Sequence, residues 1–488
     1  MHRRCLAFGF LWLPLVACVG TRLPPHHPAA LEAAIAERRA TAVLAGARVG
    51  VSVFDCGAQG RVAGFADEDG FATASNMKLV SAAVALHTLG PDHVFATELL
   101  AGGEIRDGVL HGDLLLRGLG DPSLAHGEAG MARAERLVAA LRDRGVARVT
   151  GRVKADDTWL GREHLGLGWQ WDYLDEDYAA PFGALCWRHN VVTVRVQPHA
   201  AAPVVTVVPA WWPVQAEVQV AAAGASPKIS VHRALARDPI EVRGTIAADG
   251  KVATFEIPVP DPAAFAARDL AEMLRAAGIV VGAEAVAGSA EPVLLARIES
   301  PPLHAIVAEL LRVSDNLYAE QVARASARVA TGDGSTEAMA RHAKAVLQQL
   351  GVDPAGCVLA DGSGLSRRNL VRPRQLAMLL AAMHRSDLQA PFVAGLPVAG
   401  ETGTLRNRFR DSSARGVVRA KTGFISRVVC LSGYLPRRDG TFAFCVMLND
   451  FTCSDDQAKA AVDRFVQRLC DLDPDAVAPP TIADPVRT

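Results

Sequence analysis

The chain has 488 residues, of which 50% are hydrophobic and 21% are charged, and its formal net charge is −1. This length allows two to four domains, and the composition supports a large core and excludes an intrinsically disordered protein. The near-zero net charge argues against a nucleic-acid partner.

The N-terminus has the pattern of an export signal. The short basic stretch Arg3-Arg4 precedes an apolar run, Cys5 to Val19, that is too short to span a membrane comfortably. Within it, Leu15-Val16-Ala17-Cys18 resembles the cleavage site of bacterial lipoproteins. We therefore expect residues 1–18 to be a lipoprotein-type signal, with Cys18 lipidated. The alternative is an ordinary signal peptide with a chance cysteine.

Residues 19–30, rich in Pro and His near their end, are expected to form a tether. The protein should then be exported to the periplasm or cell envelope and held at the membrane through a lipid anchor only. Seven cysteines follow Cys18 with irregular spacing and no C-x-x-C pair, so we expect most of them to be small buried hydrophobes. No His, Cys or Asp cluster has metal-ligand spacing, and we expect neither a metal nor a cofactor.

The segment after the tether is predicted to contain both helices and strands. Helical patterning begins at Leu31, two strands follow, and a buried helix comes after Ser75. The predicted helices are 31–45 and 78–89, and the predicted strands are 47–54 and 61–65.

From about residue 95 the pattern becomes strand-rich. The predicted strands are 94–100, 109–117, 149–155, 191–196, 204–208, 214–220, 240–245 and 253–257, and the predicted helices are 131–144 and 264–277. None of the chemical motifs described below falls in this block. We therefore expect 95–298 to be a β-rich insertion of one or two smaller domains.

The last third begins helical and ends in strands. Its predicted helices are 303–313, 317–330, 336–350, 373–384 and 459–469, and its predicted strands are 417–420, 428–435 and 441–448. Residues 473–488 are expected to be a flexible tail. We expect 31–94 and 299–472 to share one domain of mixed α/β (α+β) class, with a five-stranded antiparallel sheet and helices on both faces.

The first motif is Ser75-Asn76-Met77-Lys78 at the start of a predicted helix. A spacing of three puts both side chains on one helical face. A serine hydroxyl needs an adjacent base to become a nucleophile, and a lysine desolvated by apolar walls can be that base. The helix N-terminus would also favour an oxyanion at Ser75. Alone, this pattern would more often be a surface Ser and Lys.

The second motif, Ser314-Asp315-Asn316, lies between two predicted helices. Ser314 could relay a proton to a leaving amine, and the Asn316 amide could bind a substrate backbone group. Alone, the tripeptide would indicate only a helix cap or a turn.

The third motif, Lys421-Thr422-Gly423, is expected on an edge strand. There, Lys421 and Thr422 would offer a cation and a hydroxyl to a carboxylate, and Gly423 would leave room for an extended substrate. The chain has only seven lysines, yet Lys78 and Lys421 both fall in motifs. An arginine could not replace a lysine that must lose its proton.

In this order, the motifs match the S-x-x-K, S-x-N and K-T-G set of penicillin-binding proteins and class A β-lactamases. The chain resembles more closely the D-alanyl-D-alanine carboxypeptidase/endopeptidases of the low-molecular-mass class C penicillin-binding proteins, peptidase family S13. Further strings carry this resemblance: Gly120-Asp121-Pro122-Ser123-Leu124, Tyr178-Ala179-Ala180-Pro181, Asn190-Val191-Val192, Asp361-Gly362-Ser363-Gly364-Leu365-Ser366 and Gly403-Thr404-Leu405-Arg406-Asn407-Arg408-Phe409.

The resemblance implies a β-lactamase/transpeptidase-like domain interrupted by the insertion. It implies catalytic roles for Ser75, Lys78, Ser314, Asn316 and Lys421, and substrate contacts at Thr422, Gly423 and Phe424. The expected partners are peptidoglycan stem peptides, with β-lactams as covalent inhibitors, and the resemblance does not fix the oligomeric state.

Phe424 departs from the family pattern, because a Thr or Ser usually follows K-T-G. The missing hydroxyl would weaken the hold on a terminal carboxylate and favour cleavage of cross-links. A serine-type D-Ala-D-Ala carboxypeptidase/DD-endopeptidase acting through an acyl-enzyme on Ser75 is thus the main interpretation. Three alternatives are an enzyme acting mainly as a DD-endopeptidase, a β-lactamase, and a wall-binding protein with a weak or dead site. A β-lactamase is disfavoured by the large insertion, and a dead site by the intact motifs.

Overall fold

The computed structural model describes residues 28–199, 201–233, 239–283, 291–438 and 440–472. The expected signal 1–18, most of the expected tether and the expected tail 473–488 lie outside these residues. Helix α1 (Pro28–Arg39) begins three residues before the predicted helix, so the end of the expected tether is helical. Within the described ranges, no helix has both the length and the apolar character needed to cross a membrane.

The two ends of the described chain meet in one five-stranded sheet. Its order is β17-β18-β19-β1-β2, and every neighbouring pair is antiparallel. The first and last thirds are joined where β1 pairs with β19, for example Val51 with Val446. This confirms the predicted fold class. The strands are β1 (Arg48–Asp55), β2 (Gly60–Phe65), β17 (Arg419–Ile425), β18 (Val428–Arg437) and β19 (Gly440–Asn449).

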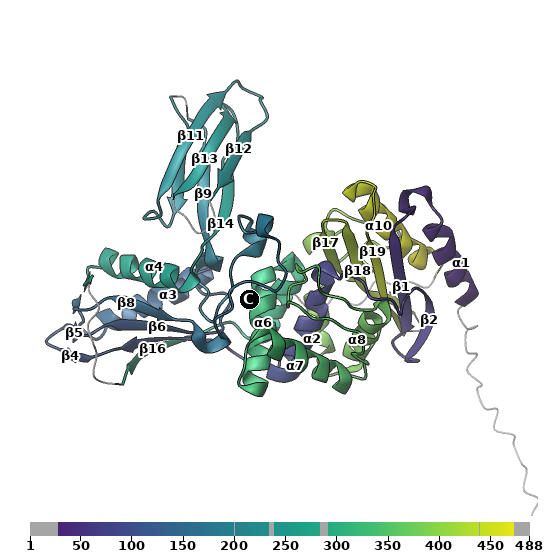
Figure 1. Ribbon diagram of the computed structural model, residues 1–488, viewed down its shortest axis with the longest axis horizontal. Coiled ribbons are helices and arrows are strands. Elements are labelled where there is room, and N and C mark those ends of the chain that lie inside the picture. The colour runs from purple at the N-terminus through teal and green to yellow at the C-terminus, as the bar shows by residue number, and fades with distance from the viewer. Residues whose placement is uncertain (1–27, 200, 234–238, 284–290, 439, 473–488) are drawn as a thin grey trace, which may run out of the picture.

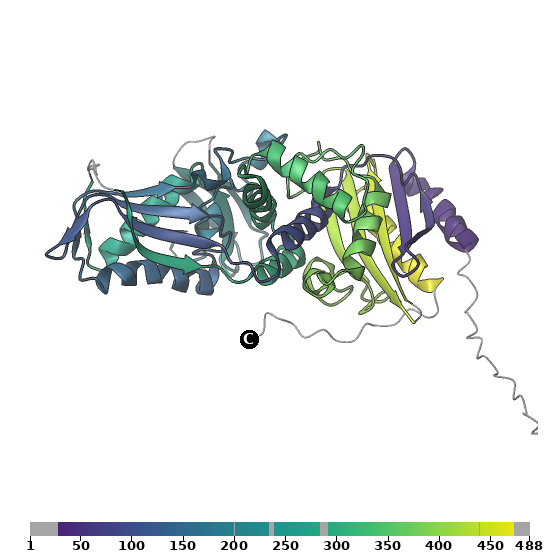
Figure 2. The same ribbon diagram turned by 90° about the horizontal axis from the view of Figure 1, so that it is seen from below.

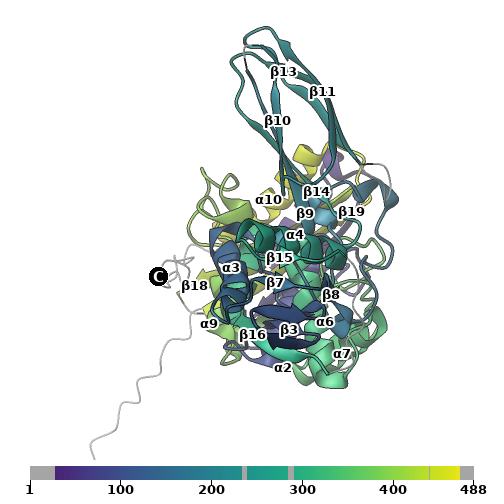
Figure 3. The ribbon, with the colours of Figure 1, turned by 90° about the vertical axis from the view of Figure 1, so that its left-hand side faces the viewer.

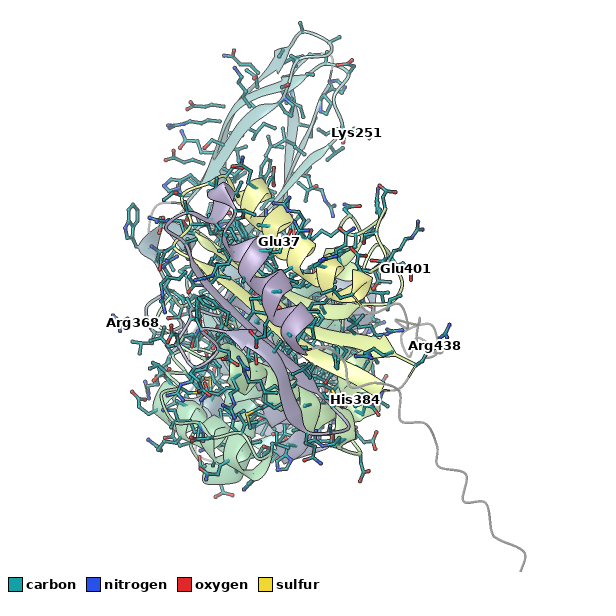
Figure 4. All side chains as sticks on the ribbon, turned by 90° about the vertical axis from the view of Figure 1, so that its right-hand side faces the viewer. Glu37, Lys251, Arg368, His384, Glu401 and Arg438 are labelled. Atoms are coloured by element: carbon teal, nitrogen blue, oxygen red, sulfur yellow. The ribbon has the colours of Figure 1, made fainter. Side chains whose placement is uncertain are left out.

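Helices cover both faces of this sheet (Figure 1). Helix α10 (Asp455–Asp471) packs on β18 and β19 from one side and contacts α1, and Figure 4 looks onto this layer, with Glu37 labelled on α1. From the other side, α8 (Pro373–Arg385) packs on β1 and β19, and α2 (Met77–Leu89) lies against α8. Because both faces are covered, β18 and β19 are nearly continuous apolar runs and are buried along most of their length.

The second motif interrupts a helical region, as predicted. Helix α5 (Leu303–Glu309) continues into a π-helical turn, Leu310–Ser314, and α6 (Asn316–Thr331) starts directly after Asp315. The Asp315 side chain accepts the Tyr318 backbone N–H at 2.9 Å and caps α6. Two more helices complete this region: α7 (Thr336–Gln349) and α9 (Gln389–Ala394), of which α9 was not predicted.

The insertion begins and ends on neighbouring strands. β3 (Ala96–Ala101) pairs antiparallel with β16 (Val293–Glu299), so Ala96 lies opposite Glu299. The chain therefore leaves the sheet domain and returns to it at neighbouring positions, as an inserted domain must. We propose 95–298 as the boundaries of this insertion. Figure 2 places this block beside the sheet domain.

Two four-stranded sheets and two helices form the first part of the insertion. The sheet orders are β16-β3-β6-β8 and β15-β7-β5-β4. The remaining elements are β4 (Glu104–Arg106), β5 (Val109–His111), β6 (Leu114–Leu119), β7 (Arg148–Val149), β8 (Val153–Asp156), β15 (Val280–Val281), α3 (Gly127–Arg142) and α4 (Pro262–Ala276).

Two further sheets of three strands form a part that projects from the rest of the molecule (Figure 3). Their orders are β10-β9-β14 and β11-β13-β12. The strands are β9 (Val191–Gln197), β10 (Val204–Val208), β11 (Val214–Ala221), β12 (Lys228–His232), β13 (Ile240–Ala247) and β14 (Ala253–Pro258).

Two predicted strands in the insertion are each divided between two sheets. The stretch 109–117 forms β5 and β6, and 149–155 forms β7 and β8. Each stretch passes from one sheet to the other at a glycine, Gly112 in the first and Gly151 in the second. The Gly151 N–H donates to the Gly112 carbonyl at 3.0 Å. A Cβ on Gly112 would lie 2.6 Å from the Gly102 carbonyl oxygen, so the close approach requires glycine.

Most of the seven cysteines of the described ranges are buried, which agrees with their prediction as small hydrophobes. Cys453 is half-buried and the others are buried: Cys56, Cys186, Cys357, Cys430, Cys445 and Cys470.

Candidate active site

A cleft of about 800 Å³ brings the three motifs to one place. Its lining includes Ser75, Ser314, Asn316 and Phe424, from three separate parts of the chain. Tyr178 and Tyr173, from the insertion, form another wall. The site therefore lies where the sheet edge, the start of α6 and the insertion meet.

Ser75 and Lys78 are in direct contact. Ser75 lies in a 3-10 turn, Ala74–Asn76, that leads into α2, and Lys78 lies in the first turn of α2. Lys78 Nζ donates to Ser75 Oγ at 2.9 Å, to Asn316 Oδ1 at 2.5 Å and to the Ser363 carbonyl at 2.7 Å. These three oxygens match the three donors of an ammonium group.

The environment of Lys78 suits a base. Its side chain is fully buried, and this burial lowers the pKa of Lys78 from 10.5 to about 8. The carboxylates of Asp361, Asp315 and Glu320 act in the opposite direction. With a pKa of about 8, roughly one Lys78 in ten carries no proton at pH 7.

A second lysine–serine pair lies beside the same cleft, which is lined by its serine, Ser314. Lys421 Nζ donates to Ser314 Oγ at 2.8 Å and to the Thr422 carbonyl at 2.9 Å. Lys421 is fully buried, and burial together with the nearby Lys78 lowers its pKa well below the usual value. Ser314 ends the π-helical turn with a φ of +70°, a conformation that non-glycine residues rarely adopt. Strained residues of this kind cluster at functional sites.

Asn316 is held by the protein at both ends of its amide. Its Oδ1 accepts from Lys78, and its Nδ2 donates to the Tyr178 carbonyl at 2.6 Å. Asn316 therefore holds the Lys78 ammonium group and contacts the insertion. The predicted contact of this amide with a substrate backbone group stays a prediction, and Asn316 lines the cleft.

The K-T-G strand is the predicted edge strand, because β17 ends the sheet. Thr422 Oγ1 donates to Thr404 Oγ1 at 2.8 Å, and Phe424 is 43% exposed at the cleft. A Cβ on Gly423 would lie 2.9 Å from the Thr73 carbonyl oxygen and 3.2 Å from the Ala74 Cβ. The glycine therefore lets this strand approach the segment before Ser75, a reason that the sequence analysis did not anticipate.

Sequence reasoning did not identify the residues that support the site. Glu320 accepts the backbone N–H groups of Gly362 and Ser363 at 3.0 and 2.9 Å, and the Ser363 carbonyl in turn holds Lys78. Burial raises the pKa of Glu320 to about 7. The string 361–366 carries part of the family resemblance, but no sequence pattern indicates that its backbone holds Lys78. Cys18 lies outside the described residues.

The fold and the site together define a serine enzyme of the penicillin-binding protein and β-lactamase class. The profile of the D-Ala-D-Ala carboxypeptidase 3 (S13) family matches residues 31–471. The chain belongs to this family, which confirms the resemblance seen in the sequence, and it is a serine-type D-Ala-D-Ala carboxypeptidase that hydrolyses peptidoglycan stem peptides.

Three comparisons illustrate this relationship. The D-alanyl-D-alanine carboxypeptidase of Actinomadura sp. (strain R39) is 35% identical over 402 residues, 77% of this chain and 73% of the relative. The crystal structure of penicillin-binding protein 4 (DacB) from Haemophilus influenzae has a TM-score of 0.76 at 25% identity and covers 91% of this chain and 98% of that chain. The same protein complexed with a novel β-lactam has a TM-score of 0.69 at 25% identity, covering 87% and 96%.

Proposed function

We propose that Ser75 is the nucleophile and Lys78 is its base. Ser75 Oγ attacks the carbonyl carbon of the penultimate D-Ala while its proton passes to the neutral Lys78 amine. The 2.9 Å contact between the two side chains and the burial of Lys78 support these roles. Backbone N–H groups of Ser75 and Phe424 would stabilise the oxyanion that forms.

The second pair completes the transfer. Ser314 and Lys421, 2.8 Å apart, pass a proton to the leaving amine as the peptide C–N bond breaks. The acyl group remains as an ester on Ser75, and water then hydrolyses this ester and releases the shortened peptide. Thr422 and the positive charge of Lys421 hold the substrate carboxylate.

One observation carries this proposal: the serines of two serine–lysine pairs, which come from three distant motifs, line a single cleft. A penicillin should acylate the same serine, as the β-lactam complex of the Haemophilus influenzae relative suggests. Mass spectrometry of the protein after incubation with benzylpenicillin tests this. We expect one adduct, on the peptide containing Ser75. An adduct on another peptide instead would contradict the role of Ser75 as the nucleophile.

We further propose that Phe424 biases the enzyme toward cross-link cleavage. Replacing Phe424 with Thr should raise the kcat/KM for a pentapeptide relative to that for a cross-linked dimer. A hydroxyl at this position can donate a charge-assisted hydrogen bond to a terminal carboxylate, which contributes about 1.5–3 kcal/mol at most. The exposed Phe424 ring instead offers apolar contact to a longer leaving group.

Phe424→Leu is the matched control, because it keeps an apolar wall and adds no donor. Its ratio of the two kcat/KM values should stay near that of the wild type. An unchanged ratio in Phe424→Thr would show that Phe424 is only a wall of the cleft and that another group, such as Ser426, holds the carboxylate.

We also propose that the protein is exported and that Cys18 carries a lipid anchor. Replacing Cys18 with Ser should release the protein into the soluble fraction of lysed cells, because two acyl chains suffice for stable anchoring without a membrane span. Cys5→Ser is the control, since it alters the same leader without the proposed lipidation site. Equal membrane association of the wild type and Cys18→Ser would contradict the anchor.

A further inference from the structure

The insertion contacts the second motif at two points. The Tyr178 carbonyl accepts from Asn316, and His189 Nε2 lies 2.8 Å from Asp315 Oδ2. Asp315 thus has two partners, because its Oδ1 caps α6 through the Tyr318 N–H. The side chains of His189 and Asp315 are 15% and 10% exposed, so solvent screens this pair poorly.

The backbone that presents His189 is unusual. Three consecutive non-glycine residues, Arg188, His189 and Asn190, have φ values of 50°, 59° and 55°. Arg188 Nε donates to Asp269 at 2.6 Å, and Asn190 Nδ2 donates to the Pro181 carbonyl at 2.8 Å. The residues on either side of His189 are therefore fixed, and together they direct its ring at Asp315.

We propose that His189 is a positioning residue of the reaction: as an imidazolium, it holds Asp315 in place and neutralises a carboxylate that would otherwise favour the protonated form of Lys78. The inference rests on the proposed role of Lys78 as base. It gives the insertion a part in the chemistry, because the charge state of one of its side chains controls how readily Lys78 loses a proton.

The electrostatics agree with this geometry. Burial alone would lower the pKa of His189, but Asp315 raises it above the usual value. Burial alone would raise the pKa of Asp315, but His189 and the Tyr318 N–H lower it. Asp315 also raises the pKa of Lys78. Asp315 is the hydrogen-bond partner of the His189 ring in the described parts of the chain, where Nδ1 has none, and Glu256 and Asp177 make smaller contributions that raise the pKa of His189.

Other charged groups also face these side chains. His126 packs against His189 with ring centroids 4.7 Å apart and the rings tilted by 41°, and burial lowers the pKa of His126, which leaves it neutral near pH 7. Glu256 on β14 and Asp177 in the 3-10 turn 177–179 raise the pKa of His189, and Glu309 on α5 raises that of His126. Asp361 and Glu320 raise the pKa of Lys78, and the charge of Lys78 lowers the pKa of the neighbouring Lys421. None of them hydrogen-bonds to Asp315 in the described ranges.

The charge of His189 depends on pH in the direction that its pKa shift sets. The pKa of His189 is raised, so the imidazolium is complete below its ordinary value of 6.5 and is lost as the pH rises through the higher folded-state pKa. Without this cation, the uncompensated Asp315 charge favours protonated Lys78. Replacing His189 with Gln keeps a donor for Asp315 but removes the cation, so the pKa of Lys78 should rise.

The test is the pH dependence of the rate constant for acylation by benzylpenicillin, measured on the full-length protein between pH 5.5 and 10. The wild-type rate should rise with a midpoint near the Lys78 pKa of about 8. In His189→Gln this midpoint should move up by about one pH unit, which lowers the rate at pH 6 about tenfold. His126→Gln, which removes a neutral neighbouring ring, should leave the midpoint unchanged.

In Asp315→Asn the midpoint of the acylation rate should move in the direction opposite to that in His189→Gln. Asn is an equally good helix cap, so α6 should remain intact, and loss of the carboxylate should move the midpoint down. A purely structural role of His189 would lower the rate equally at every pH. Unmoved midpoints in both variants would overturn the inference, and Asp315→Asn remains informative if His189→Gln does not fold. A wild type that is not acylated would instead overturn the proposed function.

Discussion

Replacing Ser75 with Ala is expected to abolish covalent labelling by penicillin and turnover of stem peptides. No other hydroxyl among the described residues contacts Lys78 Nζ, so no alternative nucleophile is activated by this base. Loss of the nucleophile of a serine peptidase costs on the order of 10⁶ in kcat. The fold should persist, because the Ser75 side chain accepts from Lys78 at a cleft and is only half-buried.

Intact-mass spectrometry after incubation with benzylpenicillin provides the measurement, with thermal unfolding as a check of the fold. Ser426→Ala is a matched control, since Ser426 is an exposed serine that lines the same cleft. The control should still form the covalent adduct, because it keeps Ser75 and Lys78. A labelled Ser75→Ala protein would remove Ser75 from the nucleophile role.

Replacing Lys421 with Ala should lower both peptide turnover and penicillin acylation by about 10² or more, which corresponds to about 2.7 kcal/mol of activation free energy. In the proposed function both ligands present a carboxylate to this cation, and Lys421 also holds Ser314 at 2.8 Å. The effect should be large because Lys421 is fully buried, where a positioned charge is poorly screened.

The kcat/KM for a pentapeptide and the acylation rate constant for benzylpenicillin test this prediction. Lys459→Ala is the control, because Lys459 Nζ lies 4.2 Å from the Phe424 ring centroid but outside the motifs. We expect it to change either constant much less than Lys421→Ala does. Unchanged constants in Lys421→Ala would exclude Lys421 from the site.

The sheet and the motif-bearing elements could be predicted from the sequence because their signals are local. The apolar runs of β18 and β19, and the helix break at Asp315, each depend on a few adjacent residues. The three motifs contain side chains with specific chemistry. Because Ser75 needs a base and a proton relay to act as a nucleophile, the sequence predicts that the three motifs lie together at one site.

The supporting contacts could not be predicted, and for a physical reason. The carbonyls of Ser363 and Tyr178 hold Lys78 and Asn316, and every residue type carries such a carbonyl. The contact between His189 and Asp315 spans 126 residues and depends on three left-handed residues that no sequence pattern indicated. Likewise, the division of 109–117 between two sheets depends on a glycine contact between distant segments.

The most direct test of the central claim is incubation of the purified protein with two substrates, a stem pentapeptide and a defined cross-linked muropeptide dimer, followed by mass analysis of the products. We expect the pentapeptide to lose one D-Ala and the dimer to be split at its D-Ala cross-link, with both reactions absent in Ser75→Ala. If both substrates remain intact while the protein still binds them, the chain is a wall-binding protein and the account of its catalysis is wrong.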